Sequence, residues 1–168
     1  MSPADINFRK GVPDDAAALS AYINVLADEG GDTIPNTRFS PEEERQFLEK
    51  AAKQDRAFFL LACDGPAIVA VLDIWAGERP FNRHAGRLGM SVLSGYRRMG
   101  IGRRLLDMAI EETKTWPGFC RIELEAVPWN IPAIRLYESR GFVREGLKQK
   151  GAKLRDEPHG VVLMALVW

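Results

Sequence analysis

The segment "YRRMGIGRRLL", residues 96–106, places two glycines among four arginines where an apolar helix is expected to begin. Glycine costs a helix about 1 kcal/mol relative to alanine, so this composition needs a reason. A helix N-terminus carries about half a positive charge and unpaired backbone N–H groups. Without side chains at Gly100 and Gly102, an anion can approach those groups closely. The segment therefore predicts a phosphate-binding helix start, and a tight turn in which glycine only supplies a positive φ is the alternative.

The composition of the chain indicates one ordinary globular domain. Its 168 residues suffice for a core of their own, and no repeat or linker divides them, so we expect a single domain over residues 1–168. Lys and Arg together number 23, as do Asp and Glu. The resulting net charge of zero argues against a general nucleic-acid-binding protein, so we expect no nucleic-acid partner.

The sequence lacks the features of membrane, secreted and metal-binding proteins. No apolar run approaches the roughly 20 residues that cross a bilayer, and the first residues lack the apolar segment of a secretory signal. Cys63 and Cys120 are isolated, which is neither a disulfide framework nor a metal site. His84 and His159 have no third ligand patterned with them. We therefore expect a cytoplasmic protein with no membrane partner and no metal.

Hydrophobic periodicity and turn signals predict the order of secondary structure along the chain. The expected strands are residues 5–11, 57–63, 67–75, 85–93, 120–127, 141–150 and 160–168. Helices are expected after a capping Asp14, after a capping Ser40, over residues 100–115 and over residues 131–140. This order predicts an α/β fold with a mixed sheet and helices on both faces.

Two motifs carry a resemblance to a known family. The pattern Arg97-x-x-Gly100-x-Gly102 resembles the [QR]-x-x-G-x-[GA] signature of the GNAT superfamily, the acetyl-CoA-dependent N-acetyltransferases. The stretch "NIPAIRLYESRGFVREG", residues 130–146, resembles the N-x-x-A-x-x-L-Y-E-x-x-G-F segment of the same superfamily, and is similar to that of the ribosomal-protein alanine N-acetyltransferases. The resemblance implies the GNAT fold, a mostly antiparallel mixed sheet splayed between its fourth and fifth strands, with acetyl-CoA as co-substrate in the opening.

The resemblance also implies where acetyl-CoA binds. Its pyrophosphate is expected on the backbone N–H groups of residues 98–103, and its pantetheine arm along residues 91–93. The residues expected to bind the cofactor are Ser91, Val92, Leu93, Arg97, Arg98, Met99, Gly100, Ile101, Gly102, Arg103 and Asn130. Backbone N–H groups near Val92 and Leu93 are expected to meet the oxyanion. Asn130 is expected to bond the pantetheine arm, to cap the helix that follows it, or to do both.

Two residues are the candidates for proton transfer. Tyr137 is the candidate acid, because its hydroxyl could reach the departing sulfur and the resemblance implies that this tyrosine contacts it; the alternative is a half-buried aromatic side chain. Glu123 and Glu125 share one face of their strand. Glu125 is the candidate base, because the ribosomal-protein alanine acetyltransferases have their catalytic glutamate at the matching place. A solvent-exposed glutamate, or a base acting through one water, would give the same pattern.

The sequence predicts an N-acetyltransferase acting on a small-molecule amine such as an amino acid, an antibiotic or a polyamine. Acidic residues between 28 and 55 suit a cationic acceptor, and the loop 30–39 suits a small one. The alternatives are a protein N-terminal acetyltransferase, a non-catalytic acetyl-CoA sensor, and a phosphate-binding interaction domain. Trp75, Phe81 and Trp129 are expected in the core or at contacts between copies, and the alternative is that they border the acceptor slot. A homodimer through the last strands is expected.

Overall fold

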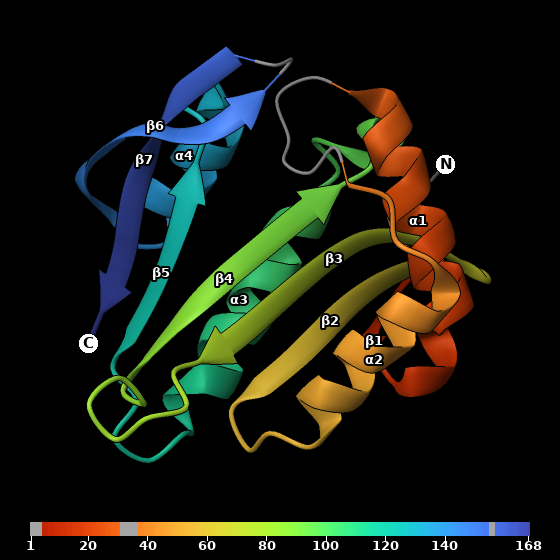
Figure 1. Cartoon of the computed structure of the whole chain (residues 1–168), viewed down its shortest axis with the longest axis horizontal. Coiled ribbons are helices and arrows are strands. Elements are labelled where there is room, and N and C mark those ends of the chain that lie inside the picture. The colour runs from red at the N-terminus through yellow and green to blue at the C-terminus, as the bar shows by residue number, and fades with distance from the viewer. Residues whose placement is uncertain (1–4, 31–36, 155–156) are drawn as a thin grey trace.

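The computed structural model describes residues 5–30, 37–154 and 157–168. Within these residues seven strands form one sheet in the order β1-β2-β3-β4-β5-β7-β6 (Figure 1). The strands are β1 (Ile6–Lys10), β2 (Ala57–Asp64), β3 (Ala67–Ala76), β4 (Ala85–Val92), β5 (Arg121–Ala126), β6 (Val143–Leu154) and β7 (Glu157–Val167). Strands β4 and β5 run parallel, and the other neighbouring pairs run antiparallel.

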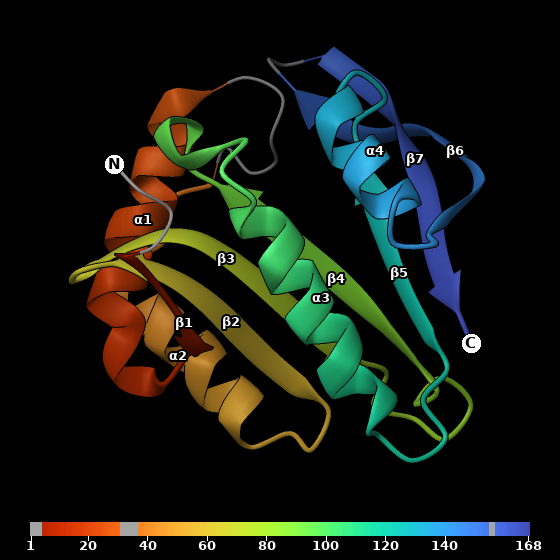
Figure 2. The same ribbon diagram turned by 180° about the vertical axis from the view of Figure 1, so that it is seen from behind.

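Helices cover both faces of this sheet. Helices α1 (Ala16–Glu29) and α2 (Pro41–Ala52) lie on one face, and α3 (Ile101–Lys114) and α4 (Ile131–Glu138) lie on the other (Figures 1 and 2). Two short 3-10 helices, η2 (Pro13–Asp15) and η3 (Ser94–Tyr96), precede α1 and follow β4. The predicted element order and the mixed, mostly antiparallel sheet are confirmed.

The core is divided by the sheet into two layers. Side chains such as Leu105, Leu106 and Ile122 are fully buried between the sheet and helices α3 and α4. Leu19 and Leu61 are buried between the sheet and helices α1 and α2. The central strand β3 is therefore buried along most of its length, which explains its nearly continuous apolar sequence.

The sheet opens between β4 and β5. Their pairing covers only Ala85↔Arg121, Gly86↔Ile122 and Arg87↔Glu123. Beyond these pairs β4 continues to Val92 and β5 to Ala126 while the two strands diverge (Figure 1). The predicted splay between the fourth and fifth strands is confirmed, and it leaves one edge of β4 without a strand partner.

The two predicted N-terminal helix caps differ in outcome. Ser40 caps α2 as predicted, since its backbone N–H donates to Glu43 Oε2 at 2.7 Å and its hydroxyl accepts from the Glu43 N–H at 3.3 Å. The prediction for Asp14 is wrong, because the 3-10 turn η2 comes first and the residue preceding α1 is Asp15. The Asp15 carboxylate makes no capping hydrogen bond to α1; it accepts from the Val12 N–H at the start of η2 at 2.9 Å and from Arg9 at 2.6 and 2.7 Å.

Some expectations from the sequence are not decided by the fold. Most of the predicted loop 30–39 lies outside the described residues. Val143, Leu147 and Val167 on the last two strands have exposed fractions of 59% each, so the predicted contact between copies stays a prediction. In the described part of the chain, no helix combines the length and hydrophobicity needed to cross a membrane.

Candidate functional site

The N-terminus of α3 presents backbone N–H groups without partners from its own helix. Gly100 precedes the helix with φ +81° and has no side chain to cap it. Arg104 is the first residue whose N–H donates to the helix, to the Gly100 carbonyl at 3.0 Å. The N–H groups of residues 101–103 are therefore open to an outside acceptor, whereas Ser40 and Asn130 cap the starts of α2 and α4 with their side chains.

The turn before α3 has the shape of an anion-binding backbone. Arg98 adopts φ +62°, an uncommon conformation for a residue with a side chain, two positions before Gly100. Alternation of left-handed with ordinary residues gathers successive N–H groups on one side. The side chains of Arg98 and Arg103 are exposed around it, while Met99 packs against the core. The structure thus brings the predicted phosphate segment together around one helix end.

Arg97 bonds partners within the chain, and its predicted contact with the cofactor stays a prediction. Its Nε donates to the Val92 carbonyl at 2.9 Å, and its terminal nitrogen lies 3.2 Å from Glu29 Oε2. The same Glu29 carboxylate accepts from the backbone N–H and the hydroxyl of Ser94 at 2.9 and 3.0 Å. Arg97 therefore joins the end of β4 to the end of α1, and its charge is shared with a carboxylate.

Gly102 faces the opening between β4 and α4. A Cβ at this position would lie 3.5 Å from Leu136 Cδ2 and 3.6 Å from both Met90 Cε and Val92 Cγ2, which are ordinary contact distances. Packing within the chain therefore tolerates a methyl group at Gly102, while any longer side chain would extend into the opening. This restricts the position to a small residue if the opening holds a ligand.

The free edge of β4 offers backbone groups to the opening. The Leu93 N–H donates to the Val69 carbonyl of β3 at 3.0 Å. Because N–H groups alternate between the two sides of a strand, those of Val92 and Met90 point away from β3, toward the opening. The expectation of an oxyanion donor is therefore wrong for Leu93, whose N–H is already used, and stays a prediction for Val92. The Ser91 hydroxyl instead bonds the Tyr22 hydroxyl at 2.8 Å, beneath α1.

Helix α4 positions Tyr137 and Asn130. Tyr137 is buried, its ring centroid lies 5.6 Å from that of Phe142, and burial raises the pKa of its hydroxyl. A raised pKa keeps the phenol protonated, as a proton donor requires. Asn130 Oδ1 accepts from the Ala133 N–H at 3.3 Å, which confirms the capping role. A contact of Asn130 with the pantetheine arm stays a prediction.

Glu125 lies on the opposite face of β5 from Tyr137. Strand β5 alternates buried Leu124 with half-buried Glu125, so Glu125 faces the side of the sheet that carries α1 and α2. Its carboxylate lies 3.2 Å from Lys148 Nζ and 3.5 Å from an Arg87 nitrogen. A hollow of about 270 Å³ adjoins these side chains. The predicted base is thus placed beside the opening and paired with two cations.

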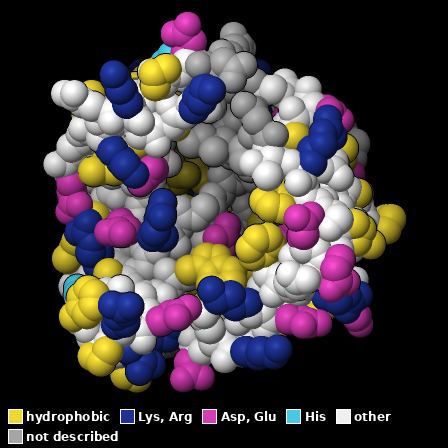
Figure 3. Space-filling view, in the orientation of Figure 1, with side chains coloured by type: hydrophobic (Ala, Val, Ile, Leu, Met, Phe, Trp, Pro, Cys, Tyr) yellow, Lys and Arg dark blue, Asp and Glu magenta, His cyan; other side chains and the backbone are white. Residues whose placement is uncertain are grey.

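A larger cavity lies between helices α1 and α2 and strands β2–β4. Its volume is about 400 Å³, and Figure 3 shows a hollow on this face with hydrophobic, acidic and basic side chains around it. Its lining includes Leu19, Ile23, Phe39, Phe47, Phe59, Val71, Trp75, Met90 and Ser91. The cavity therefore borders the same stretch of β4 that is predicted to hold the cofactor arm.

Two carboxylates also line this cavity: Asp73, which was not among the predicted site residues, and Glu44, one of the acidic residues between 28 and 55 expected to suit a cationic acceptor. Burial raises the pKa of Asp73 to about 6, while the Trp75 side chain and the charge of Arg87 act in the opposite direction. Burial, with the nearby charges of Glu43 and Asp73, raises the pKa of Glu44 to about 7. The sequence does mark Asp73, because it is the one charged residue in the apolar run AIVAVLDIW. It also points to the same face of the strand as Val71 and Trp75, which line the cavity.

The aromatic residues and the histidines have mixed outcomes. Trp75 is half-buried and lines the cavity, and whether it borders an acceptor slot stays open. Phe81 is 73% exposed, and Trp129 packs edge-to-face on His159 at 5.0 Å between ring centroids. Over the described ranges, no three His, Cys, Asp or Glu side chains gather as metal ligands would.

The raised pKa of Glu44 predicts how stability changes with pH. A carboxyl whose pKa lies above its ordinary 4.5 in the folded state stabilises the fold at low pH, and this contribution is lost as pH rises through about 7. Glu44→Gln removes this dependence. Relative to wild type, the variant should gain about 2 kcal/mol of unfolding free energy between about pH 5 and pH 8, measured by urea denaturation. A difference that does not vary with pH would contradict this account of Glu44.

Comparison with known protein sequences gives a consistent family. The family model described as "Acetyltransferase (GNAT) family" matches residues 25–142. The chain is 31% identical over 124 residues to the L-amino acid N-acetyltransferase AaaT of Escherichia coli K12, a match that covers 74% of this chain and 76% of that protein. It is 28% identical over 126 residues to the [Ribosomal protein bS18]-alanine N-acetyltransferase of the same strain, covering 75% and 80%.

Solved structures share the fold over nearly the whole chain. A crystal structure of an acetyltransferase of the GNAT family from Streptococcus pneumoniae has a TM-score of 0.89 and 31% identity, and covers 97% of this chain and 99% of that one. Structures of the same fold at lower identity were solved with acetyl-CoA. The family predicted from the two motifs is confirmed. With its open sheet, its uncapped helix and these relatives, the chain belongs to the GNAT family of acetyltransferases and is an acyltransferase.

Proposed function

We propose that this enzyme transfers the acetyl group of acetyl-CoA to the primary amine of a small molecule. The cavity beside β4 carries the proposal, because its volume of about 400 Å³ falls in the range of roughly 300–1,000 Å³ typical of small-molecule sites. Likeness to an L-amino acid N-acetyltransferase supports a small acceptor, and an amino acid, an antibiotic and a polyamine remain the candidates.

Acetyl-CoA supplies the activated thioester, and this chain offers two backbone surfaces to hold it. The open N–H groups at residues 101–103 would bind the pyrophosphate, with positive charge from Arg98 and Arg103 around them. The unpaired edge of β4 from Met90 to Val92 would hydrogen-bond the pantetheine arm. Arg97 would contribute by holding the Val92 carbonyl, and with it the end of β4, in place.

Two side chains of this chain, Glu125 and Tyr137, would then take part in the proton transfers of the reaction. An amine with a pKa near 10 is almost wholly protonated at neutral pH, and Glu125 would accept that proton, directly or through one water. The nitrogen can then attack the thioester carbonyl while the Val92 N–H stabilises the oxyanion. As the carbon–sulfur bond breaks, the Tyr137 hydroxyl would give its proton to the sulfur. The nitrogen would lose its remaining extra proton to solvent as the amide forms, and solvent would reprotonate the Tyr137 phenolate and take the proton held by Glu125.

A protein N-terminus is the second candidate acceptor. It is supported by the 28% identity to a ribosomal-protein alanine acetyltransferase and by the hollow of about 270 Å³ beside Glu125, which would leave room for peptide residues beyond the amine. A panel of small amines and alanine-starting peptides, followed by release of the CoA thiol, decides between the two. We expect kcat/KM for a small amine to exceed that for any peptide by about ten-fold or more; the reverse order would establish the second candidate.

Gly102 provides a test of the cofactor opening. Gly102→Leu should weaken acetyl-CoA binding by about 100-fold or more, measured by calorimetry, because its side chain would fill the space between β4 and α4. Gly102→Ala is the matched control, since a methyl group there meets only ordinary contacts, and its affinity should stay near that of wild type. Unchanged binding by a folded Gly102→Leu protein would place the cofactor elsewhere.

Tyr137→Phe tests the proton donor. We expect kcat to fall by about 100-fold with acetyl-CoA affinity unchanged, because only the hydroxyl is removed and the buried ring is kept. With an acetyl thioester whose thiol has a lower pKa as the donor, the variant should lose much less activity, because the departing sulfur then needs no proton. Equal losses with both donors would assign Tyr137 a packing role instead.

Glu125→Gln tests the base. The expected result is a fall in kcat of about 100-fold near neutral pH, with partial recovery as pH rises and more of the amine is neutral. Glu111→Gln, on the exposed side of α3, is the control for loss of a negative charge. A loss of activity that stays constant with pH would argue that Glu125 acts only through its ion pairs with Lys148 and Arg87.

A further inference from the structure

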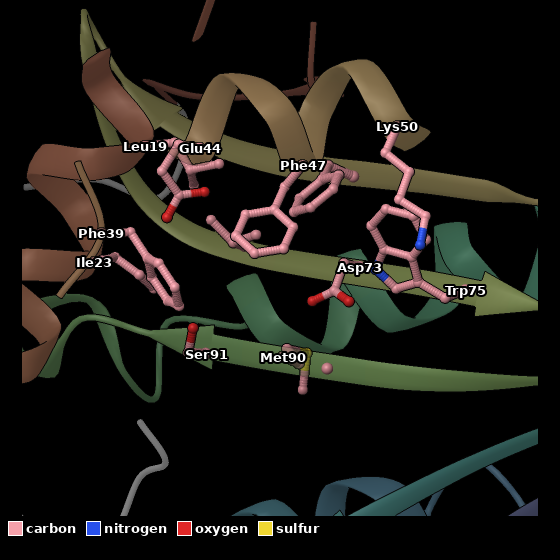
Figure 4. Close-up of a pocket in the computed structure, with 13 residues that line it drawn as sticks. Leu19, Ile23, Phe39, Glu44, Phe47, Lys50, Asp73, Trp75, Met90 and Ser91 are labelled. Carbon is pink, nitrogen blue, oxygen red and sulfur yellow. The ribbon is translucent and has the colours of Figure 1, made fainter. Parts of the chain in front are cut away.

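The cavity between α2 and β4 contains two acidic side chains in largely apolar surroundings. Figure 4 shows the carboxylates of Asp73 and Glu44 directed into the space bordered by Phe47, Met90 and Ser91. Carboxylates are seldom placed among apolar side chains unless a positive charge or hydrogen-bond donors compensate them. Their presence in this cavity therefore calls for a physical reason.

Asp73 owes its place to a glycine on the neighbouring strand. Asp73 pairs with Gly89 in the antiparallel register of β3 and β4. A Cβ on Gly89 would lie 2.7 Å from Asp73 Oδ1, which is closer than real contacts allow. The strand pair thus leaves a space for this carboxylate, at the part of β4 nearest to the proposed cofactor arm.

Glu44 adds a second carboxyl group from the opposite wall. It belongs to α2, and only 5% of its surface is exposed. Throughout the described ranges, neither Glu44 nor Asp73 forms an ion pair within 4.0 Å. Lys50, the basic residue on the cavity wall, lies 3.6 Å from Glu78 and stacks over Trp75 at 5.6 Å. The cavity therefore presents negative charge that its own lysine does not neutralise.

We propose that Asp73, with Glu44 behind it, binds the ammonium group of the acceptor, and that the acceptor is a cationic amine with an apolar body. The proposal rests on the function proposed above and names its substrate class. An ammonium ion would supply a positive charge within hydrogen-bond distance, in addition to the Trp75 side chain and the more distant charge of Arg87 that already act on Asp73. The body of the amine would lie against Leu19, Ile23 and the edge-to-face pair of Phe39 and Phe47, whose ring centroids are 5.5 Å apart.

In this arrangement Asp73 is a specificity-determining residue and Glu125 keeps the role of base. Asp73 and Gly89 lie next to the stretch from Met90 to Val92, so an amine held by Asp73 is presented to the thioester. Loss of Asp73 should therefore raise KM for the amine more than it lowers kcat. Loss of Glu125 should do the opposite, which separates the two carboxylates experimentally.

The direct test compares two ligands of the same shape that differ in charge. Calorimetry on the protein saturated with CoA would measure binding of 2-phenylethylamine and of 2-phenylethanol. We expect wild type to bind the amine about 10- to 100-fold more tightly than the alcohol. Asp73→Asn should remove most of this preference while leaving the affinity for the alcohol within about three-fold.

Two further variants provide a substitute for Asp73→Asn and a control for the loss of a charge. Glu44→Gln should reduce the preference for the amine several-fold, and it serves in place of Asp73→Asn if that variant does not fold. Glu42→Gln removes a charge from the exposed side of the same helix and should leave the preference unchanged. Equal binding of amine and alcohol by wild type, no binding of either, or a preference that survives both cavity substitutions would overturn the proposal.

Binding of the amine and its acetylation are measured separately, so failure of the ammonium site can be told from failure of the proposed acetyl transfer. If wild type selects the amine over the alcohol but acetylates no amine in the panel, the proposed acetyl transfer fails and the ammonium site stands. If it acetylates small amines but Asp73→Asn changes neither KM nor the preference, the function stands and the assignment of Asp73 fails.

Discussion

Strands β4 and β5 are parallel and hydrogen-bonded only over three residue pairs, from Ala85 to Arg87 on β4. Beyond that point the backbone of β4 has polar groups on one side that no strand satisfies, and unpaired backbone groups are costly unless water or a ligand bonds them. The remaining features of the site are arranged around this opening. The N-terminus of α3 lies at its end, and Gly102 faces its interior. The proposed ligand would complete the pairing that the sheet leaves unfinished.

The two sides of the site are mechanically joined through α1. Glu29, at the end of α1, bonds Ser94 and Arg97 in the turn that leads to α3. Tyr22, nearer the start of α1 and buried, forms a hydrogen bond through its hydroxyl with the hydroxyl of Ser91 on β4. The helix that forms a wall of the proposed acceptor cavity therefore also fixes the strand and turn proposed to hold the cofactor. A displacement of α1 would therefore change both the proposed acceptor cavity and the proposed cofactor site.

The two buried carboxyl groups in the proposed acceptor cavity lower the stability of the fold. Burial raises the pKa of both Asp73 and Glu44 above the usual values for carboxyl groups, which means that keeping them ionised at neutral pH opposes folding. Apolar side chains of similar volume would pack there without that cost. Retention of two such groups next to β4 is understandable if a cationic acceptor compensates them during each turnover, and local departures from good packing are common at functional sites.

The sequence by itself determined the element order, the cap at Ser40, the uncapped glycine start of α3 and the parity that places Glu125 on one face of β5. These depend on residues within a few positions of each other, so periodicity and spacing reveal them. Tertiary structure alone decided that Arg97 pairs with Glu29. It also decided that the Leu93 N–H donates to the Val69 carbonyl, and that the Asp73 side chain fits opposite Gly89. Each of these needs partners that are distant in the sequence, and only packing of the helices on the twisted sheet brings such partners within hydrogen-bond or contact distance.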